Sequence, residues 1–139
     1  MKSIFYIFAA WLSLCLPVLS GCKPHVYGPG ENGTFRIAIG EKVDIRLPQN
    51  GSTGFVNFWL NENECNAVRL ADRQYESGVM QKLGYIGSGG EEKLTFVGVK
   101  AGTDTVKLGS YRVFEYRRDS ANAPEKLRPD NVFIMSVTE

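Results

Sequence analysis

Few side chains in this sequence belong to the types that catalyse reactions. Cys65 could act as a nucleophile, but a catalytic thiol needs a base, and the sole histidine, His25, stands near the start of the chain. We interpret Cys65 as a small residue of a polar loop or of the start of a half-buried strand. The adjacent acids Glu91 and Glu92 point to opposite faces of a strand and do not form an acid and base couple. The sequence therefore predicts no catalytic residue.

The residue composition also disfavours a metal site and a nucleic-acid site. A zinc site needs three or four ligands, and one histidine with one cysteine in the body of the chain falls short of that number. The chain holds 16 Lys and Arg against 15 Asp and Glu, and we interpret its only adjacent basic pair, Arg117 and Arg118, as part of a solvated loop. Phosphate backbones require concentrated positive charge, so no nucleic-acid partner is expected. No motif indicates a cofactor.

The first 21 residues have the pattern of an export signal. Residues 4–19 are almost entirely apolar, but the run is short and is broken by Pro17, which disfavours a permanent membrane span. Residues 19–22 read Leu-Ser-Gly-Cys and resemble a bacterial lipobox, in which the cysteine is acylated and becomes the new N-terminus. Ordinary cleavage nearby, leaving a free thiol, is the alternative. We expect an exported lipoprotein anchored by Cys22 to a bacterial membrane, on its periplasmic side or at the cell surface.

Cleavage at this point divides the chain into three parts. Residues 1–21 are the signal, residues 22–32 are rich in glycine and proline and are interpreted as a tether, and residues 33–139 form the domain. The composition, 43% hydrophobic and 22% charged, is typical of one globular domain. Loss of Lys2 with the signal leaves 15 basic and 15 acidic residues, so the mature chain is neutral. Cys65 is then the only cysteine of the domain, and no structural disulfide is expected.

Apolar and polar residues alternate through most of the domain. Phe35, Ile37 and Ile39 alternate with residues 34, 36 and 38, a period that predicts half-buried strands. Strands are expected at residues 34–39, 43–47, 55–60, 67–71, 93–99, 103–111 and 132–137. No segment shows a helical period over three turns. The pattern predicts an all-β, immunoglobulin-like antiparallel β-sandwich of about seven strands.

Two long connections, residues 72–90 and 117–131, remain between the predicted strands, and long loops in a small sandwich often carry function. Three segments stand out in these and the shorter gaps. They are Asn50-Gly51-Ser52-Thr53-Gly54-Phe55, Gly87-Ser88-Gly89-Gly90 and Arg112-Val113-Phe114. Without any family resemblance, the first segment is interpreted as a tight turn, the second as a flexible glycine loop and the third as a strand end with an aromatic tip. Turn chemistry alone explains most of these features. The glycine loop lacks the Lys-Ser/Thr of a P-loop, so it does not predict a phosphate site.

The order and spacing of these three segments resemble the chagasin family of cysteine-peptidase inhibitors. That family carries the patterns Asn-Pro-Thr-Thr-Gly-Tyr/Phe, Gly-x-Gly-Gly and Arg-Pro-Trp, in this order, on three loops at one end of an immunoglobulin-like sandwich. Residues 40–48 and 100–103 are also similar to its strands, so the resemblance spans most of residues 32–137. This chain departs from the patterns at Gly51, at Ser52 and at the Val-Phe pair of residues 113–114.

The resemblance implies a reversible, non-covalent inhibitor of papain-like cysteine peptidases and not an enzyme. The three loops would form a wedge that fills the active-site cleft, with Ser52 and Thr53 over the catalytic cysteine. Residues 87–90 would let the main chain approach one wall closely. Phe114 would stack on the primed side, and Arg112 would support its loop or hydrogen-bond across the rim.

A function of another class uses the same scaffold. A surface or periplasmic adhesion or carbohydrate-binding module needs exposed aromatic rings for stacking, which Tyr111, Phe114 and Tyr116 would supply. An inhibitor instead needs its aromatic ring at a loop tip beside the glycine loop. The arrangement of these rings therefore distinguishes the two functions.

Overall fold

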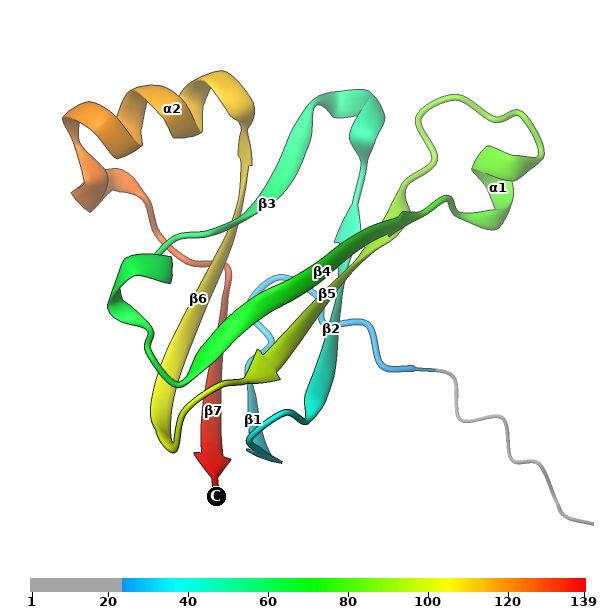
Figure 1. Ribbon diagram of the computed structural model, residues 1–139. Helices are drawn as coiled ribbons and strands as arrows, with labels where there is room; N and C mark the ends of the chain where they lie inside the picture. The colour runs from blue at the N-terminus through cyan, green and yellow to red at the C-terminus, as the bar shows by residue number, and fades with distance from the viewer. Residues whose placement is uncertain (1–23) are drawn as a thin grey trace, which may run out of the picture.

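The computed structural model describes residues 24–139, so the predicted signal and Cys22 lie outside the described residues. Two sheets pack face to face, and the prediction of an immunoglobulin-like all-β sandwich is confirmed (Figure 1). The strands are β1 (Gly33–Ala38), β2 (Lys42–Gln49), β3 (Phe55–Trp59), β4 (Val68–Glu76), β5 (Gly90–Gly98), β6 (Gly102–Arg112) and β7 (Asn131–Thr138). One sheet has the order β1-β7-β6-β3 and the other β2-β5-β4. Neighbouring strands are antiparallel except for β1 and β7, which are parallel.

The predicted alternation places apolar side chains of both sheets in one core. The most deeply buried are Ile45, Leu47, Leu94, Phe96, Val106, Leu108, Phe133 and Met135. Trp59 of β3 meets Phe96 of β5 edge to face, with ring centroids 5.2 Å apart, and so joins the two sheets. Each such side chain contributes about 1.5–3 kcal/mol by leaving water, which makes the core the main support of the fold.

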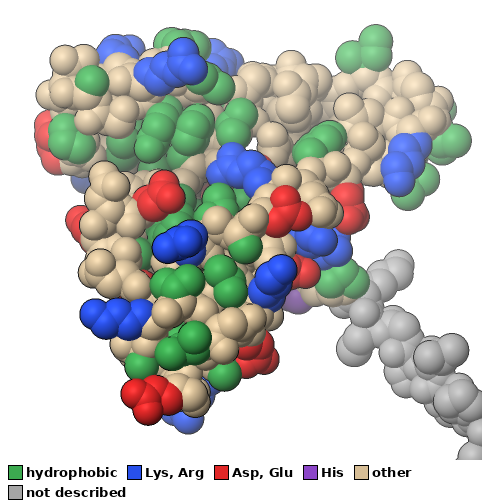
Figure 2. All heavy atoms as spheres, viewed as in Figure 1, with side chains coloured by type: hydrophobic (Ala, Val, Ile, Leu, Met, Phe, Trp, Pro, Cys, Tyr) green, Lys and Arg blue, Asp and Glu red, His purple; other side chains and the backbone are tan. Residues whose placement is uncertain are grey.

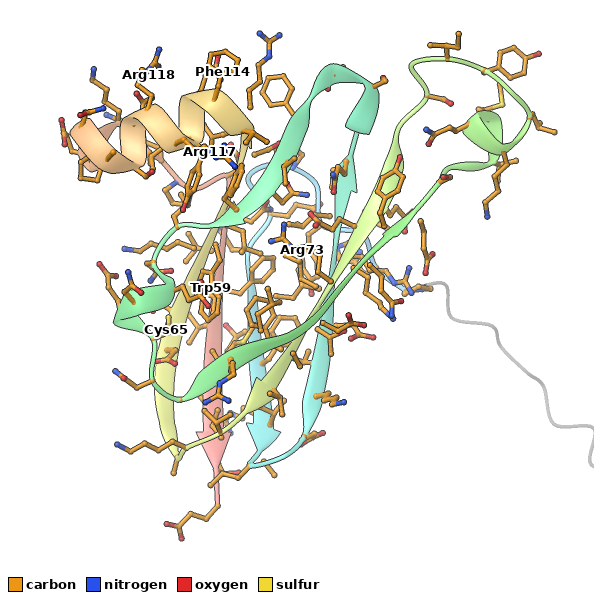
Figure 3. All side chains as sticks on the ribbon, turned by 45° about the horizontal axis from the view of Figure 1, so that its top comes forward. Trp59, Cys65, Arg73, Phe114, Arg117 and Arg118 are labelled. Atoms are coloured by element: carbon orange, nitrogen blue, oxygen red, sulfur yellow. The ribbon has the colours of Figure 1, made fainter. Side chains whose placement is uncertain are left out.

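A polar cluster also crosses the interior, close to one end of the sandwich. The carboxylate of Glu92 on β5 is 2% exposed and accepts a hydrogen bond of 2.9 Å from the side-chain amide of Asn57 on β3. Its other oxygen lies 3.2 Å from Nε of Arg73 on β4, which Figure 3 labels. Because a buried carboxylate is costly unless it is paired, this cluster fixes β3 against the other sheet.

The segment interpreted as a tether lies against the sandwich in the part that the structure describes. The backbone N–H of Tyr27 donates to the carbonyl of Arg46 at 2.9 Å, and the Tyr27 ring packs edge-on against Phe133. The side-chain amide of Asn131 donates to the carbonyls of Gly28 and Glu31, each at 2.7 Å. Aromatic packing and paired carbonyls thus hold residues 24–32 on the domain, although their composition is typical of a linker.

The connections contain short helices that the sequence pattern does not predict. They are α1 (Val79–Lys82), α2 (Val113–Asn122) and the 3₁₀ turns η1 (Gly51–Thr53), η2 (Glu62–Glu64) and η3 (Pro124–Lys126). The expected loop over residues 117–131 is wrong in its first part, which belongs to α2. None of the α2 residues is buried, so the helix has no apolar stripe that would reveal its period. No helix within residues 24–139 is long and apolar enough to cross a membrane.

Candidate functional site

All three singled-out segments lie at the same end of the sandwich. Residues 50–54 form the turn from β2 to β3, residues 87–89 precede β5, and Arg112 ends β6 just before α2. Figure 1 shows the β2–β3 turn between α2 on one side and the loop with α1 on the other, opposite the end that holds the C-terminus. The fold therefore brings residues distant in sequence into one row.

Asn50 holds the first loop and joins it to the second. Its side-chain oxygen accepts hydrogen bonds from the hydroxyl of Ser52 at 2.6 Å and from the N–H of Ser52 at 3.3 Å. Its side-chain amide donates to the carbonyl of Gly87 at 3.0 Å. Its own carbonyl accepts from the hydroxyl and the N–H of Thr53, at 2.7 and 3.1 Å. The loop is thus arranged before any partner binds, which reduces the entropy lost on binding.

The first loop is a closed turn and not an extended segment. Gly54 ends η1 in the left-handed region, with φ of 76°, where a residue with a Cβ is strained. Its N–H donates to the carbonyl of Gly51 at 3.2 Å. The carbonyls of both Asn50 and Gly51 are therefore engaged within the turn.

Backbone contacts inside the molecule restrict Gly89 and Gly90 of the second loop, and a positive φ favours glycine at Gly87. A Cβ on Gly89 would lie 3.3 Å from the carbonyl oxygen of Gln49, and one on Gly90 would clash with the carbonyl oxygen of Glu76. Gly87 has a φ of 86°. Gly90 opens β5 and so stands at the base of the loop. The sequence analysis expects the main chain of this loop to approach a partner closely, and at Gly89 and Gly90 the close neighbour in the structure is the chain's own backbone.

The third segment differs from the expected strand end with an aromatic tip. Val113 and Phe114 form the first turn of α2, directly after Arg112, while Phe114 remains 60% exposed. Arg117 and Arg118, interpreted as a loop pair, lie on the same helix, as Figure 3 shows. A helix presents Phe114 on a firmer support than a loop tip does.

A shallow, mainly apolar groove of about 710 Å³ separates the first and third segments. It is lined by Thr53, Gly54, Arg112, Val113, Phe114 and Arg117. Arg112 faces Phe55 across the β3–β6 ladder, and its guanidinium carbon lies 5.3 Å from the centroid of the Phe55 ring. This cation–π contact orients the arginine beside the groove. The groove is suited to an apolar or aromatic group of a partner.

One group of exposed residues is missing from the sequence interpretation. The apolar loop, defined as residues 79–86, exposes Val79 (73%), Met80 (51%), Leu83 (68%), Tyr85 (60%) and Ile86 (99%). In Figure 2 hydrophobic side chains mark the lobe at the upper right, where Figure 1 places α1. The sequence contains no signal for this exposure, because a short apolar run between glycines reads equally well as a buried segment.

Cys65 is not part of this end of the molecule. It follows η2, and its thiol lies 3.7 Å from the carbonyl of Thr105. Burial, followed by the charges of Asp104 and Glu64, raises the pKa of the Cys65 thiol to about 11. His25 lies 3.3 Å from Glu31 instead. The thiol is therefore protonated at neutral pH and has the properties of a structural residue.

We predict slow alkylation of Cys65 in the folded protein. At pH 8 the raised pKa leaves roughly a hundredfold less thiolate than an exposed cysteine has, so iodoacetamide should react at least tenfold more slowly than in the same chain unfolded in urea. The labelling rate should still rise as the pH approaches 10. Peptide mass spectrometry of the labelled residue gives both rates, and equal rates at pH 8 would show an accessible, reactive thiol.

The aromatic rings considered for sugar stacking do not form one open platform. Tyr116 is stacked on Phe58, with ring centroids 3.9 Å apart. The hydroxyl of Tyr111 donates to the carbonyl of Arg128 at 2.6 Å, and the ring is only partly exposed. Of the three candidates, Phe114 alone is widely exposed, and it lies beside the loops. Within the described part of the chain, no group of acidic, histidine and cysteine side chains could hold a metal ion.

A comparison with protein families matches residues 36–127, more than half of the chain, to the family described as Chagasin family peptidase inhibitor I42. The chain belongs to the chagasin family. The matched range contains all three segments at the loop end. As a member of a family of peptidase inhibitors, this chagasin homologue is not an enzyme.

Solved structures agree with the fold of this chagasin homologue. It is similar to the crystal structure of the cysteine protease inhibitor EhICP2 from Entamoeba histolytica, with a TM-score of 0.57 and 19% identity over 84% of this chain and 100% of that one. It is also similar to the solution structure of Amebosin, with a TM-score of 0.51 and 21% identity over the same shares of the two chains. No curated protein matches the sequence.

Gly51 stands where the chagasin pattern has proline, and we predict that Gly51→Pro tightens inhibition two- to fivefold. It is the first residue of η1, a position that suits proline, and nothing lies within 4 Å of an added Cβ. Proline would restrict the loop before binding, an effect of about 0.4–1 kcal/mol. Inhibition constants measured with the melting temperature test this, and weaker inhibition by a variant of unchanged stability would contradict it.

Proposed function

We propose that this protein reversibly inhibits papain-like cysteine peptidases by inserting its loop end into the active-site cleft. The observation that carries the proposal is the row of three family segments at one end of the sandwich, joined by the hydrogen bond from Asn50 to Gly87. No nucleophile, base or metal is required of the inhibitor, because occupation of the cleft alone excludes substrate.

The closed shape of the first loop, residues 50–54, supports the proposal that it covers a catalytic cysteine without being cut. Peptide hydrolysis requires a carbonyl that is accessible to the nucleophile and can be placed in an oxyanion hole. In η1 the carbonyls of Asn50 and Gly51 accept hydrogen bonds from Thr53 and Gly54, so the backbone curls away from an extended path. Ser52 and Thr53, both exposed, would meet the floor of the cleft.

The two flanking segments would bind opposite walls of the cleft. On one side, the exposed ring of Phe114 and the groove beside it offer an aromatic anchor, the kind of residue that carries most binding energy in interfaces. On the other side, Gly87 and Gly89 are exposed and have no side chains that would keep a partner away from the main chain. An interface of standard size, roughly 1,600 Å², is enough for tight reversible binding.

Steady-state inhibition of papain, followed by mass spectrometry of the recovered inhibitor, tests this function. We expect one-to-one inhibition that is reversed on dilution, with the inhibitor intact after long incubation. Rapid, stoichiometric cleavage between residues 50 and 55 would identify a substrate instead. Absence of inhibition across several papain-like peptidases would remove the proposal.

We also propose that the protein is exported and held at a bacterial membrane by acyl chains on Cys22. Support comes from the sequence alone: an apolar run with a positive start, followed by Leu-Ser-Gly-Cys at residues 19–22. Two or three acyl chains give stable anchoring, which one chain does not. The inhibitor would then act on peptidases outside the cytoplasm.

Cys22→Ala is expected to release the protein from the membrane fraction and to abolish lipid labelling. The substitution removes the thiol to which the acyl chains would be attached and leaves the described domain unchanged. Incorporation of radiolabelled palmitate into cells expressing the parent or the variant measures the effect, and Cys15→Ala serves as the control. Equal labelling of parent and Cys22→Ala would refute the anchor.

A further inference from the structure

Residues 24–32, here called the N-terminal segment, are bound to the domain although their composition is that of a spacer. Val26 forms an isolated parallel bridge to Arg46 on β2, and the N–H of Tyr27 donates to the Arg46 carbonyl. At the other end, the N–H of Gly30 donates to a carbonyl of the connection before β7 at 2.7 Å. Contacts at both ends remove the freedom that a linker of this composition would have.

The N-terminal segment closes one edge of the sandwich. This edge is formed by β1 and β2, each the end strand of its sheet. The Tyr27 ring lies edge-on to Phe35 of β1, with centroids 6.4 Å apart, while its backbone is bonded to β2. The opposite edge is formed by β3 and β4, which η2 joins, and Figure 1 shows η2 on the left and the described start of the chain on the right. The chain therefore leaves the domain at the β1–β2 edge.

This exit point is close in sequence to the residue proposed to carry the acyl chains. Cys22 stands four residues before Val26. A chain extends at most about 3.6 Å per residue, so this connection reaches about 14 Å from the domain, whereas a free spacer up to β1 would reach about 40 Å. Lipid headgroups occupy roughly 5–7 Å of each leaflet. The shorter reach therefore keeps the domain at the membrane surface.

We propose that the N-terminal segment turns the β1–β2 edge toward the membrane, where lipid headgroups are its partner. This inference rests on the proposed acylation of Cys22 and adds an orientation to it. Exposed side chains of β2 include both Lys42 and Asp44, so the approach does not require headgroups of one charge. Arg46 lies four residues before Asn50, about 13 Å along the strand, so the loop end is held beside the bilayer. The inhibited peptidase would then be bound close to the membrane surface.

Energy transfer from the acylated protein to a dye on the headgroups of phosphatidylcholine vesicles tests this orientation. The donor is attached through Lys42→Cys at the β1–β2 edge or, as the matched control, through Asn63→Cys in η2, both combined with Cys65→Ala. We expect the donor at residue 63 to lie about 14 Å farther from the lipid, the width of a four-stranded sheet. A flexible insertion of about 15 Gly and Ser residues between residues 23 and 24 should abolish this difference. All variants should keep the melting temperature of the Cys65→Ala protein.

The outcomes separate this orientation from the anchor on which it rests. If Cys22 carries acyl chains while both donors lie equally far from the lipid, the orientation is refuted and the anchor stands. If the parent incorporates no palmitate, the anchor fails and the inference fails with it. A difference that appears only with anionic vesicles, or that persists after the insertion, would assign the orientation to charge or to direct lipid binding by the domain and overturn the proposal.

Discussion

Phe114→Ala is expected to weaken inhibition of a papain-like peptidase by roughly thirtyfold. Aromatic anchors near the centre of an interface usually contribute about 2 kcal/mol or more, which corresponds to this factor. Phe114 begins α2, borders the groove beside Thr53 and Gly54, and is 60% exposed in the free protein. Because little of the ring is buried, its removal should leave the melting temperature unchanged, so the loss would be one of binding alone.

Two further variants control this experiment. Phe114→Trp restores the aromatic residue of the family pattern, adds apolar area and an N–H donor, and should tighten inhibition. Ile134→Ala removes a partly exposed apolar side chain of β7, away from the loop end, and should have no effect. Inhibition constants and melting temperatures are needed for each. Unchanged inhibition by Phe114→Ala would show that α2 does not face the peptidase.

Arg73→Met is expected to give the largest loss of stability among the variants considered, about 2–3 kcal/mol. The substitution keeps the apolar stem but leaves the carboxylate of Glu92, 2% exposed, with only the hydrogen bond from Asn57. Loss of one partner of a buried ion pair costs about 3–5 kcal/mol. Arg73 itself is 37% exposed, so we expect water to offset part of that loss.

Arg69→Met is the matched control, because Arg69 lies on the same strand and forms no ion pair within the described residues. Urea unfolding curves give the free energies of unfolding of both variants. Arg73→Met should unfold at clearly lower urea, while the control should match the parent. Equal midpoints for Arg73→Met and the parent would mean that the cluster is not a support of the sandwich.

The strands could be predicted from sequence where one face is buried and the alternation is regular. The sequence pattern predicts β4 only as far as Ala71, and the structure explains why. The pairing of β4 with β5 shifts register between Leu70 and Asp72, and residues 71–76 are all exposed. A bulge interrupts the alternation, and the rest of the strand is held by backbone hydrogen bonds that leave no hydrophobic pattern.

The sequence predicts the residues of the candidate site that belong to local motifs, but not the tertiary contacts between them. Sequence motifs identify all three segments that meet at the loop end, but the contact between Asn50 and Gly87 depends on folding and has no signal in the sequence. The sequence gives no sign that Phe114 lies on a helix, because α2 has no buried residue and packs through few apolar side chains, such as Tyr116 on Phe58. The apolar loop was missed because exposure of an apolar run is a property of the tertiary structure.

Protection of the catalytic cysteine tests occupation of the cleft most directly. Papain incubated with increasing amounts of this protein would be treated briefly with iodoacetamide, and alkylation of its catalytic thiol would be measured by mass spectrometry. The account predicts that alkylation falls in proportion to added protein, reaches its minimum at one equivalent, and recovers on dilution, while Phe114→Ala protects only at higher concentration. Alkylation at an undiminished rate in the presence of inhibiting amounts of the protein would contradict a blocked cleft.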